Sequence, residues 1–300
     1  MAYSFRLTDE SVDAGLRRIA NSQIETGLSE IRDEDLSLAD RVHQARKRCK
    51  KVRGLLRLVR PAFPSYSEEN VIFRDAARTL SATRDASAML ESLDALEAHH
   101  EGQLRKAALA PLRRALETRE ADIDRDEAEE KLSDIRLVFR EALDRLQDWS
   151  LEENGADAFA PGAAKTYKRA RKAMKAARKS GEAEDFHDWR KRVKYHWYHV
   201  RLMKKIWPPI MKDYAEQAQL LSRTLGEHHD LAVLKQAAPE LLGRKEVETA
   251  ELLDALATIR QETLEADALE RGAKLLAEKP SSLAARWASW WHTDQELDRD

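Results

Sequence analysis

Residues 43–53 read HQARKRCKKVR, and residues 187–197 read HDWRKRVKYHW. In both stretches a histidine precedes an Arg-Lys-Arg triplet by three residues and a lysine by seven. The two copies lie 144 residues apart, which is close to half of the 300-residue chain. A chance run of charge would not keep its spacing, so the pattern predicts two copies of one structural unit.

The same register continues outside these two stretches. Arg57 corresponds to Arg201 at the same offset, and the tripeptide Arg-Thr-Leu at residues 78–80 recurs at residues 223–225. The second match is displaced by one residue relative to the first, which is a small drift over this length. We therefore expect a duplication that covers most of the chain.

Apolar residues recur every three or four positions along both stretches, which is the period of a helix with one buried face. Good helix formers dominate the composition, and no strand-like alternation is convincing. In the first half we expect helices at about residues 9–32, 38–60, 66–99 and 103–149, with an interruption of the last one near residue 120. The apolar positions are Val42, Cys49, Val52, Leu56, Val59 and Phe63 in the first stretch, and Trp189, Val193, Val200, Met203 and Trp207 in the second. The expected helix starts are Thr8, Ser37 and Ser281 as N-caps and Pro111 as a first-turn proline.

Four helices in each half predict an all-α fold of two four-helix bundles that are related by a pseudo-twofold axis. The first repeat is expected over residues 1–152 and the second over residues 163–300. The joint is expected within residues 151–164, where an Asn-Gly pair and a Pro-Gly pair are turn and helix-start signals. If the two bundles face each other, their basic helices line a shared basic groove or pore.

Charge is unevenly distributed along the chain. The whole sequence has 52 Lys and Arg against 54 Asp and Glu, for a formal net charge of −2. Residues 40–60 have a net charge of +8 and residues 165–205 a net charge of +11. The remaining 238 residues must therefore carry −21. Segment 41–60 contains no acidic residue, although a solvated helix face usually alternates opposite charges, so we interpret it as an anion-binding surface.

On a helix, these basic residues step by three and four and form one stripe. A stripe over seventeen residues spans about 25 Å, which suits a polymeric anion better than one phosphate. The polymer candidates are nucleic acid, a membrane surface and inorganic polyphosphate. The first stripe has no aromatic residue on which bases would stack, and an apolar face buried in a bundle is not available to a membrane. The two stripes contain His43, Arg46, Lys47, Lys50, Arg53, Arg57 and Arg60, and His187, Arg190, Lys191, Lys194, Arg201 and Lys205.

Other features give weaker functional signals. No stretch reaches eighteen apolar residues and the N-terminus has no signal-peptide pattern, so we expect a cytoplasmic protein without a membrane span. His228-His229-Asp230 is not expected to bind a metal, because adjacent helical residues point in different directions. His196 and His199 have suitable spacing but no accompanying carboxylates. Cys49, the single cysteine, is expected in the core.

For two further motifs we expect a structural role and no catalytic one. Glu127-x-Glu129-x-Lys131 matches the ExExK pattern of triphosphate tunnel enzymes, but that pattern belongs on a β-strand and here we expect a helix. Trp287, Trp290 and Trp291 are expected to pack the last helix onto a bundle, with a partner-binding face as the alternative. No nucleophilic triad can be assembled from the spacing, so we expect no catalytic residue, no metal and no cofactor.

At these residues the chain resembles the CHAD domain, the conserved histidine α-helical domain. HQARKRCKKVR and HDWRKRVKYHW look like the two signature helices of that family, and YSFRLTDESVDAGLRRIA and LGEHHDLAVL are similar to other parts of it. The resemblance extends over residues 1–300 as a single CHAD domain. It implies two four-helix bundles with a basic groove or pore, binding of inorganic polyphosphate, and association with polyphosphate granules.

The family pattern carries over to individual positions. Its histidines correspond to His43 and His187, its first arginine to Arg46 and Arg190, and its next basic residue to Lys50 and Lys194. Arg53 matches a further family arginine, whereas Trp197 stands at that position in the second copy. The first-helix arginines correspond to Arg17 and Arg18, and Lys168 and Arg171 lie on the matching helix of the second repeat. Arg78 and Arg223 are added to the expected site because they match in the duplication.

The hypothesis from the sequence is thus a non-catalytic polyphosphate-binding protein, with polyphosphate-metabolising enzymes as candidate protein partners. An enzyme or regulatory subunit of polyphosphate or nucleotide metabolism is one alternative. An RNA-binding protein is the other, although nucleic acid is disfavoured by the missing aromatic residues in the first stripe.

Overall fold

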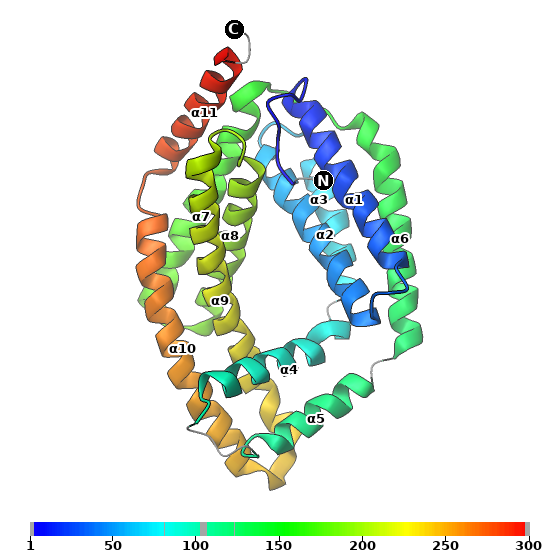
Figure 1. Cartoon of the computed structure of the whole chain (residues 1–300), viewed down its shortest axis with the longest axis vertical. Coiled ribbons are helices and arrows are strands. Elements are labelled where there is room, and N and C mark those ends of the chain that lie inside the picture. The colour runs from blue at the N-terminus through cyan, green and yellow to red at the C-terminus, as the bar shows by residue number, and fades with distance from the viewer. Residues whose placement is uncertain (1–2, 81, 103–106, 123, 298–300) are drawn as a thin grey trace.

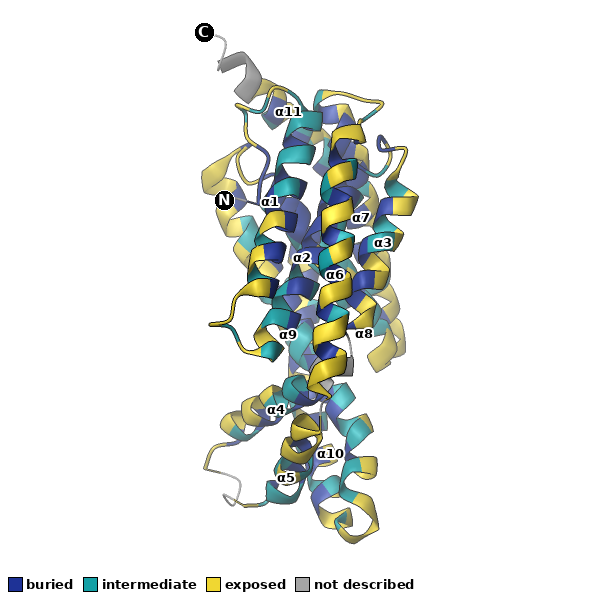
Figure 2. Cartoon of the chain, turned by 90° about the vertical axis from the view of Figure 1, so that its right-hand side faces the viewer, coloured by how far each residue is buried: buried dark blue, intermediate teal, exposed yellow. Residues whose placement is uncertain are grey.

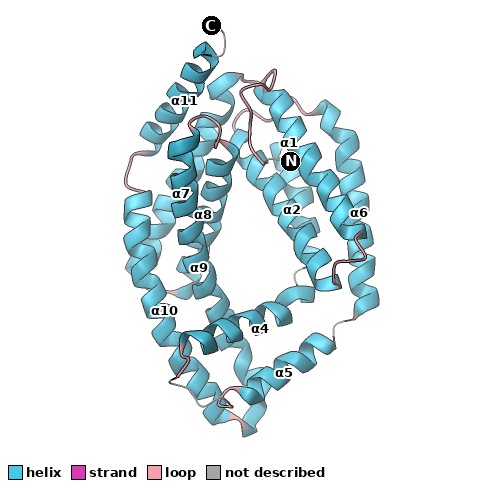
Figure 3. Cartoon of the chain, viewed as in Figure 1, coloured by secondary structure: helices cyan, strands magenta, loops and turns pink. Residues whose placement is uncertain are grey.

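The computed structural model describes residues 3–80, 82–102, 107–122 and 124–297. These residues contain eleven α-helices and no β-strand (Figure 3). The all-α prediction is therefore confirmed. The helices are α1 (Val12–Arg32), α2 (Leu38–Val59), α3 (Tyr66–Thr79), α4 (Ala82–His99), α5 (Ala110–Ala121), α6 (Arg125–Arg145), α7 (Gly155–Ser180), α8 (Ala183–Leu202), α9 (Pro208–Leu242), α10 (Val247–Leu275) and α11 (Pro280–Leu297).

The helices gather in two groups along the long axis of the molecule (Figure 1). Helices α1, α2, α3 and α6 pack together in one group, and α7 to α11 pack in the other. Helix α2 crosses between the groups and contacts both α7 and α8. Figure 2 shows that the buried residues face inward along these helices, while α6 and others present exposed residues outward.

The break between α3 and α4 differs from the prediction. The expected helix over residues 66–99 is two helices, because α3 ends at Thr79 and α4 begins at Ala82. The interruption expected near residue 120 in the following helix is confirmed, since α5 ends at Ala121 and α6 begins at Arg125. Helix α4 contacts α9, and α5 also packs on α9, so both reach the opposite group.

A second apolar cluster explains this arrangement. It is separate from the main core and joins residues of α4 and α5 to residues of α9 and α10. Met89, Leu93 and Leu96 on α4 are at most 3% exposed within it. The apolar period of residues 82–121 predicted helices correctly, but it does not specify which helices bury them.

Helix ends agree with the sequence in part. The Ser37 Oγ accepts a hydrogen bond from the backbone N–H of Asp40, and Pro111 lies in the first turn of α5, as expected. Ser11 caps α1 instead of Thr8. Helix α11 begins at Pro280, so Ser281 lies inside its first turn.

The expected turn or helix start at Pro161-Gly162 is wrong, since both residues lie inside α7. Gly162 instead permits a close approach of two helices. A Cβ atom there would lie 2.6 Å from the carbonyl carbon of Leu58 on α2. The missing side chain thus allows α7 to lie directly against the backbone of α2.

The core contains most of the predicted apolar residues. Cys49 is fully buried, which confirms its expected place, and burial raises its pKa to about 12. Trp287 and Trp291 are buried, and Trp291 lies edge-on to Phe159 of α7, so they pack α11 onto the bundle as expected. Trp207, by contrast, is 45% exposed because it precedes α9 at the surface.

Among the described residues, no helix combines the length and the apolar character needed to span a membrane.

Candidate anion-binding site

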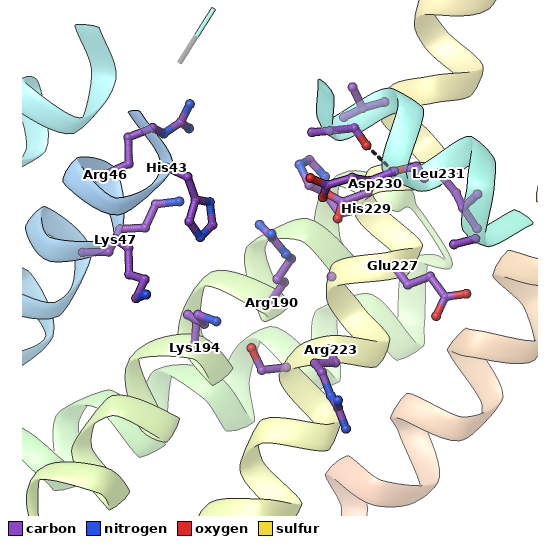
Figure 4. Close-up of a pocket in the computed structure, with 18 of the residues that line it drawn as sticks. His43, Arg46, Lys47, Arg190, Lys194, Arg223, Glu227, His229, Asp230 and Leu231 are labelled. Carbon is purple, nitrogen blue, oxygen red and sulfur yellow. Dashed lines mark hydrogen bonds between the residues drawn. The ribbon is translucent and has the colours of Figure 1, made fainter. Parts of the chain in front are cut away.

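A cavity of about 690 Å³ lies where α2, α4, α8 and α9 face one another. Its lining contains eight Lys and Arg residues against three Asp and Glu residues. The two basic stretches, which are far apart in sequence, both contribute to it. Figure 4 shows His43 and Lys47 extending from α2 toward the space that Arg190 and Lys194 of α8 approach from another side. The basic residues of the lining are His43, Arg46, Lys47, Lys50, Lys51, Arg190, Lys194, Arg201, Arg223 and His229.

Contacts on the other faces of α2 orient its basic stripe. Arg48 lies on the opposite side of the helix and is nearly buried, with its guanidinium donating to Glu30 and Gln23 of α1 at 2.5–2.9 Å. Val42, Cys49 and the other apolar positions fill the core beside it. The amphipathic pattern therefore keeps the stripe out of the apolar core of its own group of helices.

Helix α8 is held against α2 by a close crossing. Gly54 leaves room for the ring of Tyr198, whose Cδ2 atom would lie 2.8 Å from a Cβ at residue 54. The Nε2–H of buried His199 donates to the carbonyl oxygen of Gly54 at 3.1 Å. Burial and nearby cations lower the pKa of His199 well below its usual value, so this ring stays neutral.

The structure brings eight of the predicted site residues together in the cavity. Arg46 is held further by a hydrogen bond from its Nη1 to the carbonyl oxygen of Leu80 at 2.9 Å. Lys47 donates to Gln44 at 2.6 Å. The eight residues are His43, Arg46, Lys47, Lys50, Arg190, Lys194, Arg201 and Arg223.

Two expected residues of α1 do not line this cavity. Arg17 donates to the carbonyl oxygen of Trp149 at 2.6 Å, and Arg18 forms an ion pair with Asp9 at 2.6 Å. Both guanidinium groups are therefore held by their own half of the chain. They line a smaller cavity of about 300 Å³ instead.

Four expected residues of the second half and of α3 also lie outside the lining. Lys168 is exposed on α7, and Arg171 donates to the carbonyl oxygen of Glu278 at 2.7 Å. Lys191 is paired with Asp188 at 2.7 Å on the outer side of α8. Arg78 is exposed on α3.

His187 lies beside the cavity and contributes to it through a neighbour. Its ring stacks on the ring of His229 with 3.8 Å between centroids, and His229 lines the cavity. Burial, followed by nearby cationic groups, lowers the pKa of His187 to about 4 and that of His229 to about 3. Both rings are thus neutral at pH 7 and offer hydrogen bonds without charge.

Arg53 and Arg57, the last two predicted residues, lie further along the stripe of α2. Arg53 donates to Asn70 of α3 at 3.3 Å, and the guanidinium of Arg57 lies 4.2 Å from the centroid of the Tyr195 ring. Neither belongs to the cavity lining. They mark a continuation of the stripe beyond the crossing at Gly54.

Arg223 is the one residue of α9 that the sequence analysis placed in the site, and the rest of the α9 lining was not predicted. Ser222, Gly226, His229 and Val233 line the cavity at steps of four, three and four. This spacing places them on one face of a helix and is a signal that the sequence does contain. The spacing does not stand out in the sequence, because this face of α9 mixes small, polar and charged side chains.

Lys51 is the most informative residue that the prediction missed. It is 8% exposed and lines the cavity, and its Nζ lies 5.5 Å from the centroid of the Tyr3 ring. Burial, followed by the charges of Arg48, Arg201 and Lys47, lowers its pKa to about 7. Burial, Arg190 and Arg201 likewise lower the pKa of Lys194 to about 8. These ammonium groups lack sufficient negative charge nearby, which an anion in the cavity would supply.

Aromatic residues also face this side of the cavity. The ring of Trp197 lies under the Lys194 Nζ at 4.3 Å and the Arg201 guanidinium at 4.9 Å. Such contacts stabilise a cation without neutralising it. Trp197, in the position of a family arginine, therefore supports two cations instead of adding a third.

The other candidate centres have structural roles. Buried His196 contacts the Tyr214 hydroxyl at 2.9 Å, and His228 lies 2.9 Å from Glu265. Within the described part of the chain, no group of three or more His, Cys, Asp and Glu side chains could hold a metal ion. The ExExK pattern lies in α6, where Lys131 pairs with Glu127 at 2.6 Å, as its expected helical placement requires.

The model of the CHAD domain matches residues 22–239, which is more than half of the chain. No curated protein matches it. The matched residues include α2, α4, α8 and most of α9, and therefore nearly all of the helical surface that encloses the cavity.

Proposed function

Because the chain belongs to the CHAD domain family, we propose that it binds inorganic polyphosphate in the cavity between α2, α4, α8 and α9. The observation that carries the proposal is the convergence of eight Lys and Arg residues on one cavity. Lysine offers a compact charge and arginine a forked set of donors, and both match phosphate oxygens. A ligand with closely spaced negative charges would satisfy several of them together.

We also propose that the two basic stretches are equivalent parts of an internal duplication. Arg46 and Arg190 line the same cavity, as do Lys50 and Lys194, and each pair is separated by 144 residues. On this proposal, residues 1–152 and 163–300 each contribute one wall of a basic groove. The acidic remainder of the chain would repel polyanions elsewhere and direct them to this groove.

The proposed role is binding without catalysis. In the cell, such binding would associate the protein with polyphosphate granules. His187 and His229 are neutral at pH 7 and have low pKa values, so they are poor proton acceptors for hydrolysis. Incubation of the protein with long polyphosphate and Mg²⁺ is expected to release no phosphate. Sustained phosphate release would overturn the non-catalytic part of the proposal.

A competition experiment tests the ligand. Long polyphosphate, short polyphosphate, ATP and RNA would compete for the protein at physiological salt and at equal phosphate concentration. We expect long polyphosphate to displace the other three. Displacement of polyphosphate by RNA would favour an RNA-binding protein instead.

Salt is expected to weaken polyphosphate binding steeply. If about six phosphates are neutralised, and each contributes about 0.7 to the slope as in single-stranded nucleic acid, the plot of log affinity against log salt should have a slope of about −4. Titration by fluorescence anisotropy at four salt concentrations would measure this slope. A slope near zero would contradict binding through the cationic lining.

Affinity is also expected to rise by up to about tenfold as the pH falls from 8 to 6, since one pKa unit corresponds to a tenfold change in affinity. Lys51, with a pKa near 7, and Lys194, with a pKa near 8, become charged over this range. The charged groups that shift the pKa of Lys51 are Arg48, Arg201 and Lys47, which lower it, and Glu30, which raises it. Bound phosphate raises the pKa of these lysines, so binding takes up protons and is favoured at lower pH.

The control for this pH dependence is Lys51→Arg, which keeps a charge at this position at every pH tested. The variant should bind with a flatter pH profile, measured with long chains whose internal phosphates remain ionised. An unchanged profile would show that Lys51 does not titrate against the ligand.

A further inference from the structure

A second group of basic side chains lies outside the cavity, beyond the crossing of α2 and α8. We call Arg53, Arg57 and Arg60 of α2 and Lys165 and Arg169 of α7 the outer basic cluster. None of the five belongs to the cavity lining. Tyr66 of α3 and Tyr195 of α8 lie beside them, so four helices contribute to this place.

The charges of the outer basic cluster act on one another. The pKa of Lys165 is lowered first by the charge of Arg60, then by burial and by Arg169. The pKa of Arg60 is lowered by burial and by the charges of Arg169 and Arg57, with Tyr66 opposing them. The pKa of Arg53 is lowered by burial and by Arg57. The five cations are thus close enough to repel each other.

Little carboxylate charge compensates this repulsion among the described residues. Asp75 of α3 lies near enough for the charge of Arg53 to help lower its pKa, but Asp75 is already paired with Arg74 at 2.7 Å. The groups that favour the charged forms of Arg53 and Arg60 are Tyr66, Tyr195 and Cys49. Within the described residues, none of the five cations forms an ion pair with a carboxylate. Elsewhere in the molecule, arginines at similar depth are paired, as Arg48 is with Glu30 and Arg145 with Glu69.

Several guanidinium donors of the cluster also lack partners. The Nε atoms of Arg57 and Arg60 are buried and have no hydrogen-bond acceptor among the described residues. Their guanidinium groups lie over the Tyr195 ring at 4.2 Å and the Tyr66 ring at 5.6 Å. Ring faces attract these cations but accept little of their hydrogen-bonding capacity. An oxyanion bridging the outer donors would compensate the charge.

The outer basic cluster continues the stripe that lines the cavity. Lys50 belongs to the lining, and Arg53, Arg57 and Arg60 follow it at steps of three, four and three residues. These steps keep them on one side of α2. At 1.5 Å per residue, Arg60 lies about 15 Å along the helix from Lys50.

We propose that the outer basic cluster is a second binding site for phosphate chains, occupied together with the cavity by one long polyphosphate. This inference rests on the proposed function of the cavity and adds a preference for long chains. A short chain in the cavity does not reach Arg60, Lys165 and Arg169. A long chain reaches both sites, and its second contact forms at the high effective concentration of an attached ligand.

The test removes the distal half of the outer basic cluster. The variant Arg60→Gln/Lys165→Gln/Arg169→Gln loses three charges and keeps every residue of the cavity lining. The matched control is Lys175→Gln/Arg178→Gln/Lys179→Gln, which loses three exposed charges near the other end of α7. Circular dichroism checks that both variants retain their helix content.

Binding is measured with polyphosphate of about a hundred phosphates and with triphosphate, the first being long enough for the two-site contact that multivalent binding requires. In the cluster variant, affinity for the long chain should fall at least tenfold relative to the control, and affinity for triphosphate should stay within about twofold. Equal affinity of the two variants for the long chain would overturn the second site. If the cluster variant lost as much affinity for triphosphate as for the long chain, the cluster would be part of the cavity site. That result would also overturn the proposal of a second site.

The cavity variant described in the Discussion separates this inference from the proposed function. Loss of triphosphate binding in that variant supports the cavity as the primary site. Retention of both affinities there would reject the proposed function, whatever the cluster variant does. The residual long-chain binding of the cavity variant should disappear when the three cluster substitutions are added.

Discussion

Replacement of Arg46, Lys50, Arg190 and Lys194 by glutamate is expected to abolish the binding of polyphosphate to the cavity. The four residues come from α2 and α8 and all line the cavity. The eight-to-three excess of cationic over acidic residues becomes four to seven. If each lost charged contact contributes about 1.5 kcal/mol, affinity falls by about 10⁴-fold.

The quadruple variant is expected to fold. The cations of the cavity now lie close to one another, as the lowered pKa values of Lys51 and Lys194 indicate. Glutamates at the four positions would lie near Lys47, Lys51, Arg201 and Arg223, which relieves repulsion and creates opposite-charge pairs. The helix content measured by circular dichroism should therefore be retained.

The matched control reverses four charges outside the cavity. Lys172, Lys175, Arg178 and Lys179 are exposed on α7, and their replacement by glutamate changes the net charge equally. This control should lose far less affinity, since distant surface charges are screened by salt. Normal affinity of the folded cavity variant would show that the cavity is not the binding site.

The second large effect concerns stability and arises at Gly162. In Gly162→Ala, the new methyl group would lie 2.6 Å from the carbonyl carbon of Leu58. The obstacle is the backbone of α2, which cannot rotate away as a flexible side chain does. Overpacking of this kind costs about 1–3 kcal/mol, and a backbone obstacle favours the upper end of that range.

Gly226→Ala provides the matched control within α9. A Cβ atom there would lie 3.7 Å from the Arg190 Nε, which is an ordinary contact. Both substitutions gain about 1 kcal/mol of helix propensity, so this gain cancels in the comparison. The free energy of unfolding, measured in urea, should therefore differ by about 3 kcal/mol between the two variants. Equal stabilities would mean that α7 does not lie against α2 at this position.

Local sequence signals predicted the helical parts of the site well. The spacing of His43, Arg46 and Lys50 defines a helix face by itself, because side chains three and four residues apart are neighbours on any α-helix. The same argument applies to Arg190 and Lys194. Because this spacing occurs twice and acidic residues are missing from segment 41–60, the sequence indicated that the ligand of these helices is an anion.

For other site residues the prediction was wrong, because contacts between distant segments decide where their side chains lie. Arg18 matches the family arginine in sequence, but the turn before α1 presents Asp9 to its guanidinium. Lys51 was left outside the stripe, yet the crossing of α2 and α8 brings it beside Tyr3 and into the cavity lining. Helical spacing predicts neither position, because the residues that contact Arg18 and Lys51 belong to other segments of the chain.

The sequence by itself determined that the chain is helical, which face of each basic helix carries charge, and to which family it belongs. Only the tertiary structure decided that α4 and α5 pack on α9 and α10, that Gly162 lies against α2, and which cations share the cavity. The physical reason is that helix period and charge spacing act over a few residues of one segment. The approach of two helices depends instead on how their side chains fit together, which no single segment contains.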